Sequence, residues 1–288
     1  MRHMTVTTVY RLPGNDPWEN LAVEEQLLDS LEPQTMALVL YVNRPCVVLG
    51  KHQNPLREVR LDEAAARGLP VIRRASGGGT VYHDEGNLNW SFLVEKSQYS
   101  RGEIPLAIAR ALQPLGFDLE VGALGDLLWN GKKVSGTASL VRKDRVLHHG
   151  TLLCRARLDD LHGVLGPTGT LHHWVGVSSR PASVVNLGIS VDAAARALFS
   201  AFPAAHKASA PAASPLLLER LHGREWTWDE TPVFEWEGTT LLGPARVRVS
   251  HGQIEAVQGD RTSNLGNMVG MPFFVPQLFP GMSRGEVS

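Results

Sequence analysis

Hydrophobic and polar positions first take on a regular period near Asp16, where a helix is predicted to begin. Asp16 is a good N-cap residue, and Pro17 suits the first helical position. Apolar residues then recur at helical spacing over residues 18–28. The next run, residues 36–42, is nearly all apolar, which predicts a buried strand.

Later segments are predicted to form more strands, with helices between them. From Leu88 to Val94, apolar positions alternate with other side chains at period two, which is typical of a half-buried strand. Residues 132–142 and 146–153 are predicted to form a hairpin. Further helices are predicted at about 58–68, 104–115 and 191–202, the last capped by Ser190. We therefore expect an α+β fold, with helices packed on a mixed sheet.

The composition of residues 204–215 predicts a boundary between domains. This stretch (AAHKASAPAASP) is rich in Ala, Ser and Pro and lacks large apolar residues, as linkers often do. We predict a large domain over residues 1–203, a linker over 204–215 and a small domain over 216–288. Within the small domain, residues 226–257 are predicted to form short strands around several aromatic residues.

Composition and charge exclude several classes of protein. The chain has 288 residues and a formal net charge of -1, so no global basic field exists to attract nucleic acid. No apolar run approaches the roughly 20 residues of a membrane span, and the N-terminus lacks the apolar stretch of a signal peptide. The two cysteines, Cys46 and Cys154, cannot form a disulfide framework for a chain of this size. We therefore expect a cytoplasmic protein.

Three consecutive glycines mark the first stretch with candidate chemistry, RRASGGGTVYHDEGN at residues 73–87. Glycines 77–79 lie between two predicted strands, where they let the backbone approach a ligand and turn its N–H groups toward an anion. Arg73 and Arg74 can pair with phosphate or carboxylate, and Ser76 adds a hydroxyl donor. A glycine bulge with surface arginines explains the same pattern, and spacing alone does not decide between the two. The spacing matches neither a Walker A loop nor a dinucleotide fingerprint.

Two adjacent lysines mark the second stretch, GDLLWNGKKVSGTASL at residues 125–140. Lys132 and Lys133 point to opposite sides of a predicted strand, so one can face a cleft while the other faces solvent. A lysine in a glycine-flanked pocket can neutralise a phosphoryl transition state or a carboxylate. Gly136, Ala138 and other small residues leave room for a ligand. Taken alone, a solvated hairpin is the better interpretation, since surface lysines are frequent.

The histidines and cysteines offer little further chemistry. His148 and His149 are adjacent on a predicted strand and point to opposite faces, so they cannot easily share a metal ion. The pair His172 and His173 has the same difficulty. We therefore predict no metal site built from protein ligands alone. Both cysteines lie in apolar runs and are interpreted as core residues, and the chain contains no GxSxG elbow.

Both stretches resemble segments of the lipoate–protein ligase A family. RRASGGGTVYHDEGN is similar to that family's signature, ordinarily RR-x-SGGG-AVYHD-x-GN. Further segments resemble it in the same order: DPWENLAVEEQLL, VVLGKHQNP, GDLLWNGKKVSGTASL, HHGTLL and VSSRPASVVNLG. The resemblance spans about residues 8–200 and is specific, because several motifs agree in order and distance. It implies a biotin/lipoate ligase-like catalytic domain, followed here by a shortened α/β accessory domain.

The resemblance implies a role for each matching residue. Lys133 would be the catalytic lysine, in contact with the lipoate carboxyl oxygen and the α-phosphate. Asp126 falls in the family's Asn-Asp pair, although Gly125 stands here in place of the Asn. The other residues implied to bind lipoate or ATP are Arg74, Ser76, Gly77, Gly78, Gly79, Thr80, Val81, Tyr82, His83, Gly136, Ala138 and His149.

The implied activity is that of a lipoate–protein ligase. ATP, with Mg²⁺, would activate lipoic acid to lipoyl-AMP, and a lysine of an acceptor lipoyl domain would then attack the mixed anhydride. The implied acceptors are E2 subunits of 2-oxoacid dehydrogenases or the glycine cleavage H protein. Neither nucleic acid nor a membrane is an implied partner.

Two alternatives to a complete ligase stay open on the sequence. A lipoyl or octanoyl transferase that uses a pre-activated donor fits the short C-terminal segment of about 73 residues after the linker. A non-catalytic lipoyl-adenylate binder is the other alternative, although retention of Lys133 and the whole glycine loop counts against it. A thioester mechanism is disfavoured, because residues 121–129, where related cysteine-dependent enzymes carry the nucleophile, contain no cysteine.

Overall fold

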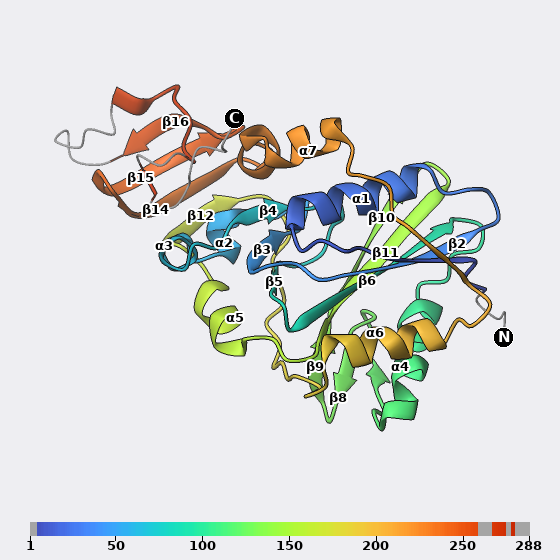
Figure 1. Ribbon diagram of the computed structural model, residues 1–288. Helices are drawn as coiled ribbons and strands as arrows, with labels where there is room; N and C mark the ends of the chain where they lie inside the picture. The colour runs from blue at the N-terminus through green and yellow to red at the C-terminus, as the bar shows by residue number, and fades with distance from the viewer. Residues whose placement is uncertain (1–4, 259–266, 275–277, 280–288) are drawn as a thin grey trace. The chain divides into compact units, whose positions relative to one another are not determined.

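A computed structural model describes residues 5–258, 267–274, 278 and 279 of the chain (Figure 1). By its internal contacts the chain divides into two compact units. Unit 1 comprises Met1–Pro45, His83–Leu158 and Pro181–Leu218, and unit 2 comprises Cys46–Tyr82, Asp159–Arg180 and Glu219–Ser288, so far as these residues are described. Each unit is thus assembled from separated stretches of sequence. None of the helices in the described parts has the length and apolarity that crossing a membrane requires.

Unit 1 is built on a mixed six-stranded sheet with the order β10-β11-β6-β2-β1-β13. Its strands are β1 (Thr8–Arg11), β2 (Met36–Tyr41), β6 (Asn87–Glu95), β10 (Thr137–Arg142), β11 (Arg145–Leu153) and β13 (His206–Ala208). Strand β1 pairs in parallel with β2 and β13, and the other pairs are antiparallel. The predicted linker therefore contributes an edge strand. A smaller sheet contains β7 (Glu120–Val121), β8 (Leu127–Trp129) and β9 (Lys132–Ser135).

Helices cover both faces of the six-stranded sheet (Figure 1). Helix α1 (Pro17–Asp29) packs Leu27 and Leu28 in the same core cluster as Val39 of the sheet. Helices α4 (Glu103–Leu112) and α6 (Val191–Ser200) share a second core cluster with the alternate sheet residues. Because both faces are covered, the whole of β6 from Asn87 to Val94 is buried. The prediction of a half-buried strand over residues 88–94 is therefore wrong.

Capping residues fix the ends of these helices as the sequence predicted. Asp16 Oδ1 accepts the backbone N–H groups of Trp18 and Glu19 at 3.0 and 3.1 Å at the start of α1. Ser190 Oγ accepts the N–H of Ala193 at 3.1 Å at the start of α6. The helix predicted over 104–115 is α4 followed by a 3-10 turn, Gln113–Leu115, that ends at Gly116 with φ of 89°.

Unit 2 contains two sheets with different pairings. The first has the order β4-β3-β5, with β3 (Cys46–Leu49), β4 (Val71–Arg73) and β5 (Val81–His83), and β3 pairs with β4 in parallel. The second is antiparallel and contains β12 (Thr170–Trp174), β14 (Phe234–Thr240), β15 (Gly243–Ser250) and β16 (Gln253–Gln258). The buried core of unit 2 combines apolar residues of β3 with an aromatic cluster that includes Phe234, Trp236, Phe273 and Phe274.

Two predictions for unit 2 are corrected by the structure. The single helix predicted over 58–68 is two short helices, α2 (Pro55–Glu58) and α3 (Leu61–Ala66), because Val59 between them is extended. Trp226 and Trp228 do not lie in strands but in a π-helical turn, Glu225–Asp229, between α7 (Pro215–His222) and β14. The remaining short helix is α5 (Leu158–Val164).

Candidate active site

The glycine loop, defined as residues 74–80, connects β4 to β5 in unit 2. Arg74 is buried, and its guanidinium donates to groups within the loop. Its Nε donates to Ser76 Oγ at 2.8 Å, and Nη2 donates to the carbonyl oxygens of Gly77 and Gly79, the latter at 2.8 Å. Gly78 has φ of 81°, a conformation that favours glycine. Arg74 therefore holds the shape of the loop for which the sequence predicted ligand binding.

A network of side chains supports the other end of the loop. Ser179 Oγ accepts the N–H of Thr80 at 2.9 Å and the amide of Gln53 at 3.1 Å. Gln53 Oε1 accepts the Thr80 hydroxyl at 2.7 Å, and the backbone N–H of Ser179 donates to the Glu58 carboxylate at 3.1 Å. Sequence reasoning did not single out these supporting residues. Gln53 and Ser179 nevertheless lie in VVLGKHQNP and VSSRPASVVNLG, two of the segments that resemble the ligase family.

Two glycines of the loop, Gly77 and Gly79, have different surroundings. A Cβ at Gly79 would lie 3.0 Å from Ser179 Oγ, so a side chain there would press on the supporting network. A Cβ at Gly77 would meet no atom within 4 Å. Open space therefore adjoins the loop at Gly77, so a ligand can approach the backbone closely there.

Beyond the loop, β5 carries the last three residues of the predicted signature set. Val81 is half-buried, whereas Tyr82 is buried with its hydroxyl 3.4 Å from Asp160 Oδ2. His83 belongs to unit 1, where its Nδ1 lies 3.0 Å from Asn43 Nδ2. Asn43 in turn accepts a hydrogen bond from Asn20 at 2.8 Å. Strand β5 thus separates the predicted set into a unit 2 group that ends at Tyr82 and a unit 1 group that begins at His83.

Lys133 and Asp126 form an ion pair in unit 1. Lys133 Nζ lies 3.1 Å from Asp126 Oδ1, and each side chain keeps about a quarter of its surface exposed (26% and 27%). The lysine side chain crosses Gly136, where a Cβ would lie 3.0 Å from Lys133 Cε. Lys132 is exposed, so the two lysines alternate as the sequence predicted. Gly125, which replaces the family's Asn, has φ of 88°, a region that Asn also tolerates.

A buried carboxylate accompanies His149 on the sheet face that α1 covers. His149 Nδ1 lies 3.0 Å from each Glu24 carboxylate oxygen, and Glu24 also accepts the hydroxyls of Ser91 and, at 3.2 Å, Tyr41. Burial alone would raise the pKa of Glu24, but the nearby His149 ring and these hydrogen bonds lower its pKa below the ordinary value. Sequence reasoning missed Glu24, Ser91 and Tyr41. Ala138 lies beside this group, since it pairs with His149 across β10 and β11.

His148 points to the opposite face, as the strand period requires. Its Nδ1 lies 3.1 Å from the Tyr99 hydroxyl, and its ring lies 5.9 Å from that of Trp90. Burial lowers the pKa of His148 to about 4, so the ring is neutral at pH 7. The described residues contain no group of three or more His, Cys, Asp or Glu side chains that could hold a metal ion. Burial also raises the pKa of Cys154 to about 12, which suits a core residue rather than a nucleophile.

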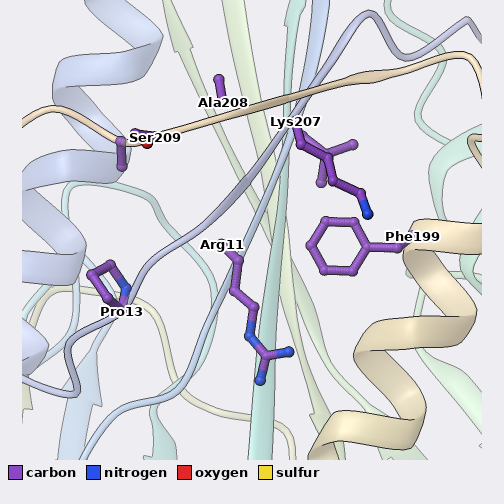
Figure 2. Close-up of a pocket in the computed structure, with 8 residues that line it drawn as sticks. Arg11, Pro13, Phe199, Lys207, Ala208 and Ser209 are labelled. Carbon is purple, nitrogen blue, oxygen red and sulfur yellow. The ribbon is translucent and has the colours of Figure 1, made fainter.

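A pocket at the edge of the six-stranded sheet lies apart from these residues. It has a volume of about 320 Å³ and opens between β1, β13 and α6, where Lys207 Nζ lies 5.7 Å from the centre of the Phe199 ring (Figure 2). Its lining, which includes Arg11, contains none of the residues predicted to bind a ligand. The pocket therefore adds nothing to the candidate site.

The structure thus brings the predicted residues together in two groups. One group, in unit 2, is the glycine loop with Val81 and Tyr82. The other, in unit 1, contains Lys133, Asp126 and Gly136 close together. Ala138 and His149 of the same unit pair across β10 and β11, and His83 lies at the end of β5. The unit 1 group presents the partly exposed Lys133 ammonium, and the unit 2 group presents the loop backbone at Gly77. Both features suit an anionic ligand.

Comparison with known proteins places most of the chain in one family. Residues 16–202 match the model of the lipoyl protein ligase A/B catalytic domain. Lipoate-protein ligase LplJ of Bacillus subtilis is 35% identical over 181 residues, which cover 62% of this chain and 55% of that protein. Lipoate-protein ligase A of Psychrobacter cryohalolentis is 38% identical over 172 residues, covering 60% and 51%. The chain thus matches these relatives over only about half of their length.

Solved structures agree on the fold. P. falciparum LipL1, in complex with lipoate, has a TM-score of 0.68 at 23% identity and covers 88% of this chain and 84% of its own. A lipoate-protein ligase A bound with ATP has a TM-score of 0.64 at 25% identity, covering 78% and 98%. A bi-partite lipoate protein ligase from Thermoplasma acidophilum, described with its E2 lipoyl domain, has a TM-score of 0.64 at 25% identity, covering 78% and 96%.

Proposed function

The chain belongs to the lipoyl protein ligase A/B catalytic domain family, and we propose that it is a lipoate–protein ligase. The observation that carries the proposal is the ion pair of Lys133 with Asp126, together with the passage of the lysine side chain over Gly136. A partly exposed ammonium that is held by a carboxylate, above a residue without a side chain, is placed to meet an anionic substrate. We propose lipoate and ATP as the anionic substrates, because the matched relatives are named lipoate-protein ligases and a similar structure has ATP bound.

In the proposed first step, a lipoate carboxylate oxygen attacks the α-phosphorus of ATP. The new bond joins that oxygen to phosphorus, the bond to the β-phosphate breaks, and pyrophosphate leaves with its electron pair. Negative charge develops on the phosphoryl oxygens, and Lys133 stabilises it. We assign the N–H groups of the glycine loop to binding of an anionic or carbonyl oxygen of the substrate, and Arg74 keeps the loop in shape.

In the proposed second step, the amine of an acceptor lysine attacks the carbonyl carbon of lipoyl-AMP. An amide forms, AMP departs, and the amine loses a proton. The remaining predicted residues, including Thr80, Tyr82, His83 and His149, are assigned to binding of the adenylate or the acyl chain. The proposed acceptors are lipoyl domains of 2-oxoacid dehydrogenase E2 subunits or the glycine cleavage H protein, and the proposed location is the cytoplasm.

Mg²⁺ enters the proposal with ATP. Magnesium usually binds through one or two carboxylates together with substrate phosphates, rather than in an all-protein cage. Asp126 fits that donor chemistry as a single, partly exposed carboxylate. When bound, the ion would neutralise charge on the phosphates, and Asp126 is the residue we propose to hold it.

The test is a mass spectrum of a purified acceptor lipoyl domain after incubation with the protein, lipoate, ATP and Mg²⁺. A parallel reaction supplies synthetic lipoyl-AMP in place of lipoate and ATP. We expect a lipoyl mass increase in both reactions. Modification from lipoyl-AMP alone would instead make the chain a transferase that uses a pre-activated donor. Modification in neither, with E2 and H-protein acceptors both tried, would contradict an enzymatic role.

A matched pair of lysine variants makes the test specific. Lys133→Ala is expected to lower the rate by about 10²- to 10³-fold, as removal of a group that stabilises transition-state charge commonly does. Lys132→Ala removes the neighbouring exposed lysine of the same strand and is expected to leave the rate within about twofold. Equal rates for the two variants would remove Lys133 from the proposed mechanism.

A further inference from the structure

Arg73, the first residue of the signature RRASGGG, is a fully buried cation whose side chain lies outside the glycine loop. Six hydrogen bonds connect its guanidinium to five oxygen atoms. Burial lowers its pKa to about 10, so the group is still charged at pH 7. A charge that is taken completely out of water is costly unless it is well bonded. The guanidinium therefore holds in place the backbone segments whose oxygen atoms accept its hydrogen bonds.

One side of the guanidinium binds the segment between β14 and α7. Nε and Nη2 donate to the carbonyl oxygen of Thr227 at 2.9 and 2.8 Å, and Nη2 also donates to the Thr231 hydroxyl at 3.0 Å. Trp226 of the same π-helical turn donates its indole N–H to the backbone carbonyl of Arg73 at 2.7 Å. Both threonines are buried. Arg73 is therefore bonded through its side chain and its backbone to residues more than 150 positions away in the sequence.

The other side of the guanidinium binds the turn after β3. Nη1 donates to the carbonyl oxygens of Gly50, Lys51 and Gln53 at 3.2, 2.9 and 2.8 Å. This four-residue turn, residues 50–53, is a second piece of backbone whose path depends on the same cation. Arginine suits the task because its fixed fork of five N–H donors reaches several acceptors at once, which a lysine ammonium cannot do.

The turn at residues 50–53 directly supports the glycine loop. Lys51 donates its backbone N–H to the carbonyl oxygen of Ser76 at 2.8 Å, and Gln53 Oε1 accepts both the Gly50 N–H at 2.9 Å and the Thr80 hydroxyl at 2.7 Å. Gly50 touches the loop so closely that a Cβ there would lie 2.2 Å from the carbonyl oxygen of Gly78. A shift of this turn therefore shifts the loop.

We propose that Arg73 is a positioning residue that couples the C-terminal segment 227–231 to the glycine loop, so that the loop is held in its ligand-binding shape only while that segment is in place. The inference rests on the proposed function for its catalytic consequence. Under this proposal, residues 227–231 act on the glycine loop through Arg73 and the turn 50–53.

The test removes one hydroxyl from each of two buried threonines in unit 2. Thr231→Val deletes the acceptor for Arg73, whereas the control Thr240→Val deletes a hydroxyl that bonds locally to Gly243 and Leu242 at the β14–β15 turn. Both substitutions keep the side-chain shape, and both proteins are the full chain. The first readout is hydrogen exchange at the amides of residues 76–80, and the second is the division of the activity change between KM for lipoyl-AMP and kcat.

We expect Thr231→Val to speed exchange at residues 76–80 by about tenfold, the equivalent of one hydrogen bond to a charged group, and to raise KM with little change in kcat. Thr240→Val is expected to leave both unchanged, even where its effect on global stability is similar. Arg73→Lys, which keeps the charge and loses the fork, is expected to act like a stronger Thr231→Val.

Equal exchange at the loop in the two threonine variants would overturn the coupling. The exchange measurement needs no turnover, so it decides the coupling even where the wild-type chain modifies no acceptor. Absent turnover would contradict the proposed function, and unchanged loop exchange would contradict the coupling, so the two failures are distinguishable.

Discussion

At the scale of single residues, His148 and His149 show how one strand gives two histidines different environments. His149 lies against the Glu24 carboxylate, whereas His148 lies in an apolar core beside Trp90 and Tyr99. The environment of His148 favours the neutral ring, because burial disfavours the charged form and the nearby His149 and Arg101 add electrostatic repulsion. A buried neutral histidine makes folding depend on pH, and His148 therefore allows a quantitative prediction.

The pKa of His148 predicts a loss of stability in mild acid. In the unfolded chain the ring titrates near 6.5, and in the fold its pKa is about 4. Between these values only the unfolded chain takes up the proton, so the free energy of unfolding falls as the pH falls from 6.5 to 4, by about 3 kcal/mol at ~1.4 kcal/mol per unit. In His148→Gln, which cannot titrate, that part of the slope is expected to vanish. Denaturant melts of both proteins at pH 7, 5.5 and 4 measure it, and parallel curves would contradict the assignment.

The roles of other single residues could be predicted only where their partners are close in the sequence. The alternation of Lys132 and Lys133 was predictable, because a strand places adjacent side chains on opposite sides. The partner of His149 was not, since Glu24 lies 125 positions away in a helix. Arg73 and Arg74 look equivalent in the sequence, yet Arg73 donates to distant backbone whereas Arg74 donates to its own loop. Only tertiary contacts distinguish them.

At the scale of elements, substitutions of single glycines separate the structural role of the glycine loop from its proposed role in binding a ligand. Gly77→Ala is expected to keep the free energy of unfolding within about 1 kcal/mol, because its Cβ meets no neighbour and its φ is not positive. The same substitution is expected to raise KM for lipoyl-AMP at least tenfold, since the Cβ would occupy the space through which the ligand reaches the backbone. Thermal melts and steady-state transfer assays provide the two numbers.

Gly50→Ala is the matched comparison for Gly77→Ala. Its Cβ would lie 2.2 Å from the carbonyl oxygen of Gly78, so the turn or the loop must move and the melting temperature is expected to drop. A KM for Gly77→Ala that equals the wild-type value would mean that the ligand does not approach this part of the loop.

Helices and strands were predicted correctly where the sequence signal lies within a few residues. They were predicted wrongly where burial depends on elements that are distant in the sequence. The caps Asp16 and Ser190 identified two helix starts, because capping involves only the next few residues. Strand β6 has an alternating sequence but is buried from Asn87 to Val94. Helix α1 packs on the face that carries polar positions, where Ser91 donates to the Glu24 carboxylate. The π-helical turn with Trp226 resembles strand sequence, because aromatic residues are frequent in both settings.

At the scale of the whole molecule, the order of segments in the chain differs from their grouping in space. The sequence predicts a linear division into residues 1–203, 204–215 and 216–288, which stays a prediction. Contacts instead group residues 219–288, so far as they are described, with 46–82 and 159–180. Linker-like composition at 204–215 predicts a boundary between domains, but composition carries no information on which distant segments share a core.

The two descriptions predict different behaviour for a chain that ends at Leu218. The linear division predicts that every strand before the linker keeps its protection against hydrogen exchange. The grouping by contacts predicts that β3 and β4 lose it while β2 and β6 keep it, because the core of unit 2 includes Phe234, Trp236, Phe273 and Phe274. Four such side chains contribute about 6 to 12 kcal/mol when buried, which is comparable to the whole stability of a domain. Full protection of β3 and β4 in the shortened chain would favour the linear division, and with it a catalytic domain that folds without its C-terminal segment.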